Sequence, residues 1–164
     1  MTTRQWTGRV FLGRLAETLS TLIESQSADL FNTAGLVIPV KSCSLMMAIR
    51  SRDPGAAVDL ARDLDCSHQL VLQKIPKLLQ LGLIEQEPCS QDRRRKLFRL
   101  TDTGRSNLAV ADTLFPAIER AYDGLGEGAT DVYEAMEATI AALKARPLVE
   151  RVDPRLFDPA LRRP

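Results

Sequence analysis

The stretch LIEQEPCSQDRRRKLFRLT, residues 83–101, carries the strongest structural signal in this chain of 164 residues. Residues 83–87 and 96–100 read as two strands, and the segment between them is polar and contains a proline, as is typical of a hairpin turn. The same segment holds the consecutive arginines Arg93–Arg95, followed by Lys96. The stretch therefore predicts a β-hairpin with a strongly basic tip.

Directly before this hairpin, the sequence predicts two helices joined by a short turn. Apolar residues at helical spacing favour a helix over residues 56–64 and another over residues 68–81. Ser67 is a good N-cap for the second helix, and Gly82 is a typical residue for ending it. Two helices joined by a short turn and followed by a basic hairpin are the layout of a winged helix-turn-helix that binds DNA.

Further helices are expected on both sides of this unit. Long amphipathic patterns cover residues 8–32 and 103–125, Thr130 is expected to cap a last helix that ends near residue 145, and residues 147–164 contain four prolines and are expected to be extended. The predicted fold class is mainly α with a small β-hairpin wing. The predicted domains are an N-terminal dimerisation helix (1–35), the winged lobe (36–101), C-terminal dimerisation helices (102–146) and a tail (147–164).

Positive charge is concentrated in the predicted winged unit. The whole chain has a net charge of only +1, but residues 66–99 hold seven basic and three acidic residues, a net charge of +4. No acidic residue lies between Cys66 and Ile84, so the second helix would not repel phosphates. A nucleic-acid footprint is therefore expected to be local.

The second helix would enter the major groove, where its early, outward residues can reach base edges. Glutamine can pair with adenine, an apolar side chain can touch the thymine methyl group, and lysine more often meets phosphates. On this basis the DNA-binding residues are expected to be Ser67, His68, Gln69, Leu72, Gln73, Lys74 and Lys77, with Arg93, Arg94, Arg95 and Lys96 in the wing.

These residues, together with their flanks, resemble the MarR family of bacterial transcriptional regulators. The resemblance rests on Leu60-Ala61, Leu64–Gln69 and Gly82–Ile84, on Asp92–Arg95, and on the motif Leu100-Thr101-Asp102-Thr103-Gly104-Arg105. It covers residues 10–145. The Asp-x-Arg wing followed by Leu-Thr-x-x-Gly-Arg is its specific part.

The resemblance implies a homodimer whose terminal helices interlock and whose two winged helices bind the half-sites of a pseudo-palindromic DNA operator. It implies a repressor that is released by a small ligand, often an aromatic one. It also implies that Arg94 enters the minor groove and that Asp92 orients it. By analogy the ligand would touch Phe11, Leu15, Cys43, Met46 and Met47, although these residues are also the simplest candidates for core packing.

Two features depart from the family pattern. Pro76 lies inside the second helix, where proline removes a backbone hydrogen bond, and Leu70 and Leu72 stand where the family has small polar residues. These residues favour an alternative, a winged-helix module that binds a protein partner and retains residual DNA binding.

The three cysteines are widely spaced, and the chain has one histidine, so neither a disulfide framework nor a metal site is expected. Cys89, in the basic hairpin tip, is expected to be exposed, and a second alternative is a regulator that senses oxidants through it.

No catalytic motif and no cofactor-binding motif is present, so an enzyme is not expected. The chain also lacks an apolar run of membrane-spanning length, which favours a cytoplasmic protein without a membrane partner.

Overall fold

The computed structural model describes residues 8–89, 95–123 and 131–153 of the chain. The chain divides into two compact units, residues 1–115 and residues 116–164. The elements of the first unit begin with a 3-10 turn, η1 (Arg9–Phe11), and the long helix α1 (Leu12–Thr33). A second 3-10 turn, η2 (Val40–Ser42), leads into α2 (Cys43–Arg52).

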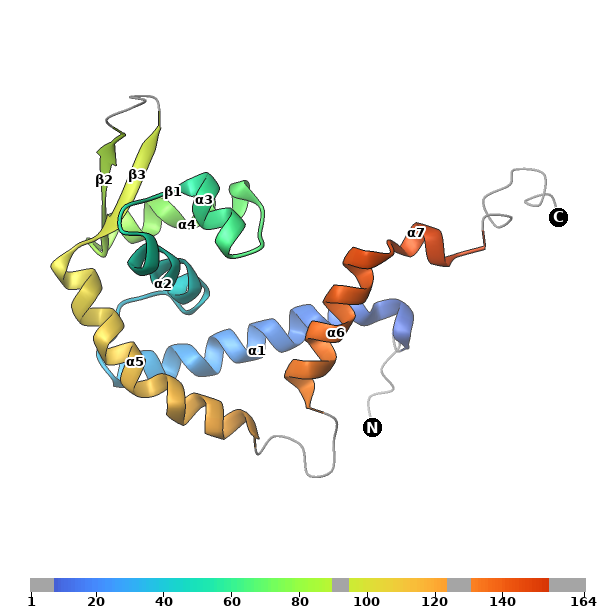
Figure 1. Cartoon of the computed structure of the whole chain (residues 1–164). Helices are drawn as coiled ribbons and strands as arrows, with labels where there is room; N and C mark the ends of the chain where they lie inside the picture. The colour runs from blue at the N-terminus through green and yellow to red at the C-terminus, as the bar shows by residue number, and fades with distance from the viewer. Residues whose placement is uncertain (1–7, 90–94, 124–130, 154–164) are drawn as a thin grey trace. The chain divides into compact units, whose positions relative to one another are not determined.

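The next elements form the winged lobe. They are β1 (Gly55–Ala56), α3 (Ala57–Asp63), α4 (His68–Gln80), β2 (Ile84–Pro88) and β3 (Lys96–Leu100). In Figure 1 the helices α2, α3 and α4 gather at the base of the sheet, and β2 and β3 extend from it as a hairpin. The predicted fold class, mainly α with a small wing, is confirmed.

The sheet has three strands, in the order β1-β3-β2, and every pairing is antiparallel. The third strand, β1, was not predicted, because its two residues are too few to show alternation and follow a proline that reads as a loop. Gly55 pairs with Phe98, and a side chain at Gly55 would lie 3.0 Å from Leu60. The strand therefore lies so close to α3 that position 55 has little room for a side chain.

One apolar core holds the lobe together. It joins the buried faces of α2, α3 and α4 to the sheet and to the first half of α5 (Asp102–Asp123). Its fully buried members are Leu45, Met46, Ile49, Leu60, Leu78, Leu83 and Leu108. Burying a side chain of this size stabilises the fold by roughly 1.5–3 kcal/mol.

Two local devices connect α4 to the sheet and to α5. Gly82 adopts a left-handed φ of 64°, and the Leu83 amide donates to the Leu78 carbonyl at 3.0 Å, which closes the end of α4. The Thr101 hydroxyl donates to the Gly82 carbonyl at 2.6 Å and accepts from the Gly104 amide at 3.0 Å, which caps α5. Gly82 as the helix stop and Ser67 as the cap of α4 are both confirmed.

The described part of the second unit contains α6 (Val132–Ala145) and α7 (Leu148–Arg151). The prediction that Thr130 caps α6 is wrong, because the Asp131 carboxylate accepts from the Tyr133 and Glu134 amides at 2.8 and 3.2 Å. An extended tail from Pro147 is also wrong for the first residues, which form α7. The Arg151 guanidinium donates to the Ala142 carbonyl at 2.6 Å, so this turn closes the end of α6.

Candidate nucleic-acid interface

The turn between α3 and α4 sets the direction of the second helix. The Cys66 amide donates to the Ala61 carbonyl at 3.0 Å, and Asp65 takes a left-handed φ of 50°, which aspartate tolerates better than most residues. The Ser67 hydroxyl then accepts from the Leu70 amide at 3.2 Å. Because the turn is closed at both ends, α4 leaves the core at a fixed angle.

Helix α4 separates its residues sharply by face. Val71, Ile75 and Leu78 are buried against the core. Gln69, Leu72 and Gln73, which are predicted to reach base edges, are exposed on the rest of the helix surface. Ser67 and His68, at the N-terminal end of α4, are exposed as well.

The two lysines of α4 are engaged with the chain itself. The Lys74 ammonium group donates to the Lys41 backbone carbonyl in η2, and the Lys77 ammonium group lies 3.4 Å from the Gln80 side-chain oxygen. Lys74 is half-buried, whereas Lys77 is exposed. A role for either lysine at phosphates stays a prediction.

Pro76 lies inside α4 and is exposed. The helix nevertheless continues for four residues beyond it, to Gln80. Proline has no amide hydrogen to donate to the carbonyl of Leu72, four residues earlier. Because Pro76 and Leu72 are exposed, water can bind that carbonyl instead.

The wing is a regular hairpin up to its tip. The pairs run from Ile84 opposite Leu100 to Pro88 opposite Lys96, and the Cys89 amide donates to the Arg95 carbonyl at 2.9 Å. The predicted wing residues Asp92, Arg93 and Arg94 lie outside the described residues. Lys96 is exposed.

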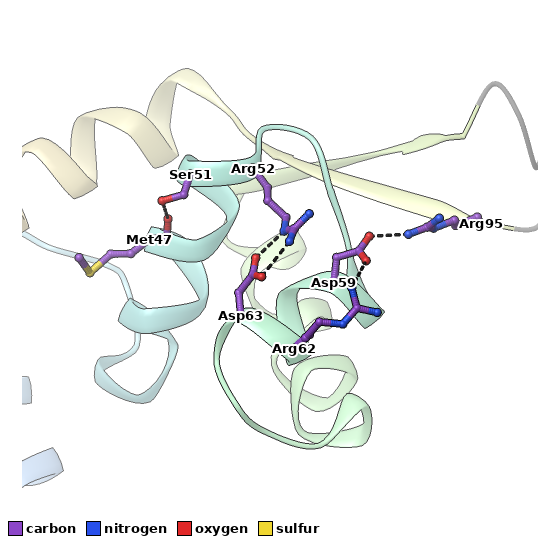
Figure 2. A network of polar contacts seen from close by, with 7 residues as sticks. All are labelled: Met47, Ser51, Arg52, Asp59, Arg62, Asp63 and Arg95. Atoms are coloured by element: carbon purple, nitrogen blue, oxygen red, sulfur yellow. Dashed lines mark hydrogen bonds and ion pairs between the residues drawn. The ribbon is translucent and has the colours of Figure 1, made fainter. Parts of the chain in front are cut away.

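Arg95 makes an ion pair that the sequence analysis missed. Its guanidinium group donates to the Asp59 carboxylate of α3, and the Arg62 guanidinium lies 3.4 Å from the other oxygen of that carboxylate (Figure 2). The three groups thus join the tip end of the wing to the first helix of the helix-turn-helix. Only the Asp59–Arg62 spacing of three residues is visible in the sequence, because Arg95 lies 36 positions away.

A second ion pair braces α2 against α3. The Arg52 guanidinium donates two hydrogen bonds to the Asp63 carboxylate, one of them at 2.8 Å (Figure 2). These hydrogen bonds lower the pKa of Asp63 and raise the pKa of Arg52. Both side chains are well exposed to solvent, so the pair orients the helices more than it stabilises them.

Arg99 on β3 is also matched by acids. Its guanidinium lies 3.7 Å from the Asp53 carboxylate and 3.6 Å from that of Glu87. Arg105 approaches Asp53 at 3.7 Å from the other side. The arginines at the base of the wing therefore face carboxylates of the same chain.

The residues predicted to contact a ligand differ in burial, and their role in ligand binding stays a prediction. Met46 is completely buried and Cys43 packs against the same core, whereas Leu15 and Met47 are exposed and Phe11 is half-buried in the 3-10 turn before α1. Burial raises the pKa of the Cys43 thiol to about 11. Met46 and Cys43 therefore contribute to the packing of the core.

Two further expectations concern cysteine and metal chemistry. Cys89 was expected to be exposed, but it is half-buried. Its amide donates to the Arg95 carbonyl, next to the opposite strand, so the residue continues the hydrogen bonding of the hairpin and is not part of a free loop. Within the described ranges, no group of three or more histidine, cysteine, aspartate or glutamate residues could hold a metal ion.

Comparison with known proteins identifies the class to which this surface belongs. Residues 43–104 match the family model of the winged helix DNA-binding domain, so the lobe built by α2, α3, α4 and the hairpin is a winged helix domain. The solved structures that the chain resembles include a mutant MarR from E. coli complexed with operator DNA, so the predicted resemblance to the MarR family is confirmed at the level of the fold.

Three of these structures show the extent of the likeness. The transcriptional repressor CouR bound to a 23-mer DNA duplex is 21% identical over 85% of this chain and 99% of its own, with a TM-score of 0.63. The PcaV regulator of Streptomyces coelicolor in complex with its natural ligand is 18% identical over 82% and 92%, also with a TM-score of 0.63. Reduced AbfR bound to DNA is 23% identical over 81% and 93%, with a TM-score of 0.59.

No curated protein sequence matches the chain. Among the described helices, none is both long and apolar enough to cross a membrane.

Proposed function

We propose that this protein is a homodimeric regulator of transcription that binds a specific double-stranded DNA sequence, and that it is not an enzyme. The observation that carries the proposal is the outward face of α4, which is exposed, contains no acidic residue and stands beside a basic hairpin. The winged helix domain assigned to residues 43–104 and the DNA-bound neighbours CouR and AbfR support it.

In the proposed complex, α4 lies in the major groove and the wing reaches the adjacent minor groove. Ser67, Gln69, Leu72 and Gln73 meet base edges, and His68 stands at the entrance of the helix. Lys77 and Lys96 meet phosphates. Arg93 and Arg94 enter the minor groove, where arginine meets an enhanced negative potential, and Asp92 orients Arg94.

The dimer is proposed because the second unit carries an uncovered apolar stripe. Val132, Met136, Ile140 and Leu143 recur at steps of three and four along α6, and each is at least 40% exposed in the single chain. Soluble monomers rarely leave such a stripe open, and a second copy would cover it. Two copies then present two winged helices to two half-sites, which gives a pseudo-palindromic operator.

We further propose that the regulator is a cytoplasmic repressor and that a small molecule, with aromatic compounds as the first class to test, releases it from DNA. The support is the fold shared with CouR, described as a repressor, and with PcaV, described in complex with its natural ligand. A ligand would reach Leu15 and Met47 more readily than the buried Met46.

The test is selection of bound duplexes from a random-sequence library by the purified full chain, with its molar mass measured by sedimentation. The proposal expects an inverted repeat and a dimeric mass. Arg94→Ala should weaken binding to the recovered sequence at least tenfold, whereas Arg120→Ala, which removes the same charge from the second unit, should not. Recovery of no common sequence would contradict specific DNA binding and would favour the alternative of a protein-interaction module.

A further inference from the structure

The outward face of α4 has an unusual composition for a helix that reads DNA. At 100° per residue, Gln69 and Gln73 lie in one row on the side opposite the buried Val71 and Ile75. Pro76 and Gln80 continue this row toward the end of the helix. In the first half of α4 the centre of the accessible face is therefore a pair of side-chain amides.

Two leucines flank this row. Leu70 lies on one side of it and Leu72 on the other, and these side chains are 41% and 46% exposed. Neither contributes to the core of the lobe. Their exposure costs solvation free energy in the isolated chain, which contact with an apolar group would recover.

The side chains that usually read guanine are scarce on this face. α4 contains no arginine, Lys74 is half-buried and donates to the Lys41 carbonyl, and the exposed Lys77 is assigned above to phosphates. Arginine or lysine paired with guanine O6 and N7 is the commonest specific contact in the major groove. What remains on the face is an amide row between two apolar flanks.

We propose that α4 reads A·T base pairs, with Leu70 and Leu72 against the 5-methyl groups of thymine and Gln69 and Gln73 paired with adenine. Adenine presents N7 and N6 to a glutamine amide, and thymine is the base that carries a methyl group in the major groove. This inference rests on the proposed function, since it names the DNA chemistry that the same helix would recognise.

The test uses a duplex recovered by selection and a second copy in which deoxyuridine replaces every thymine. Deoxyuridine keeps the hydrogen-bonding pattern and removes only the methyl group. Each contacted methyl group should be worth about fourfold in affinity, from about 0.8 kcal/mol per buried carbon. A dimer that makes one or two such contacts in each half-site should therefore bind the deoxyuridine duplex about 16- to 256-fold more weakly.

The variants Leu70→Ala and Leu72→Ala locate the effect. Both residues are exposed and alanine favours helix, so the fold should be kept, which unfolding curves would check. Each variant should reduce the ratio between the two duplexes, and the double variant should bring it close to one. Val37→Ala, which trims an exposed apolar side chain outside α4, should leave the ratio unchanged.

The possible failures are distinguishable. An equal affinity of the wild-type protein for both duplexes would overturn this inference and leave sequence-specific DNA binding intact. A ratio that persists in the double variant would place the methyl contact elsewhere and would also overturn it. Absence of any selected sequence would overturn the proposed function, and this inference with it.

Discussion

The winged lobe and the C-terminal helix α6 use apolar residues in opposite ways. In the lobe, Leu60, Leu78 and Leu83 are completely buried within one chain. In α6, no residue is buried by the described part of the chain, although the helix is the more apolar of the two regions. The lobe thus completes its core within one chain, whereas the apolar side chains of α6 stay exposed in the single chain. Truncating an apolar side chain should therefore change the free energy of unfolding differently in the two regions.

The largest expected difference between the two regions comes from truncating one leucine in the lobe and one isoleucine in α6. Leu78→Ala should lower the free energy of unfolding by about 2–5 kcal/mol, because it leaves a cavity in a closed core. Ile140→Ala should change the unfolding of the isolated chain by less than about 0.5 kcal/mol, because that side chain is 45% exposed. Urea unfolding at protein concentrations that keep the chain monomeric measures both. Equal losses would show that α6 is packed within its own chain.

A smaller but still large effect is expected at Gly104, near the start of α5. A Cβ atom there would lie 2.0 Å from the Leu83 carbonyl oxygen, which is backbone and cannot turn away. Gly104→Ala should therefore destabilise the lobe by about 1–3 kcal/mol. Gly13→Ala is the control, because nothing lies within 4 Å of its added Cβ on α1 and alanine favours helix by up to about 1 kcal/mol. Thermal unfolding of the two variants should shift in opposite directions.

The burial of Cys43 beside the lobe core should make the free energy of unfolding depend on pH above neutrality. The pKa of the Cys43 thiol is raised to about 11 by burial, so its stabilising neutral form is fully present below pH 9 and is lost as the pH rises through 11. The stability of the wild type relative to Cys43→Ser should stay constant up to pH 8 and fall between pH 9 and 11. Unfolding curves at a series of pH values measure this difference. A constant difference up to pH 11 would mean that water reaches the thiol.

The smallest effect is expected from the exposed pair between Arg52 and Asp63. Because its pKa is lowered, the Asp63 carboxylate contributes stability above the ordinary aspartate pKa and loses that contribution as the pH falls through its folded value. Asp63→Asn should thus be slightly less stable than the wild type at pH 7, and the two should converge in acid. Convergence already at pH 6 would contradict a lowered pKa.

The local signals of the fold could be predicted from the sequence because they depend on neighbouring residues. Ser67 at the start of α4, Gly82 at its end and the hairpin after it follow from capping and turn preferences, and all three are present. β1 could not be predicted, since it is held by pairing with a strand more than 40 positions later. The cap of α6 was assigned one residue early because threonine and aspartate are adjacent in the sequence and both can cap a helix, although aspartate is the better cap.

In the candidate interface, too, features set by neighbouring residues could be predicted and contacts between distant residues could not. The outward residues of α4 follow from helical periodicity, and they are exposed in the structure. The contacts of Lys74 with Lys41 and of Arg95 with Asp59 could not be foreseen, because they join residues 33 and 36 positions apart. Net charge along the sequence therefore overstates the number of cations that the isolated lobe offers to a polyanion.

The pairing of Arg95 with Asp59, and of Arg99 with Asp53 and Glu87, has a consequence for how such a protein would search a genome. Attraction to random-sequence DNA comes almost wholly from phosphate contacts, and a guanidinium group already facing a carboxylate adds little to it. The very large excess of random sites competes for the protein in proportion to that attraction. In the proposed function, two wing arginines held internally would shorten each stay on random sequence and leave a larger share of the molecules free to occupy the operator.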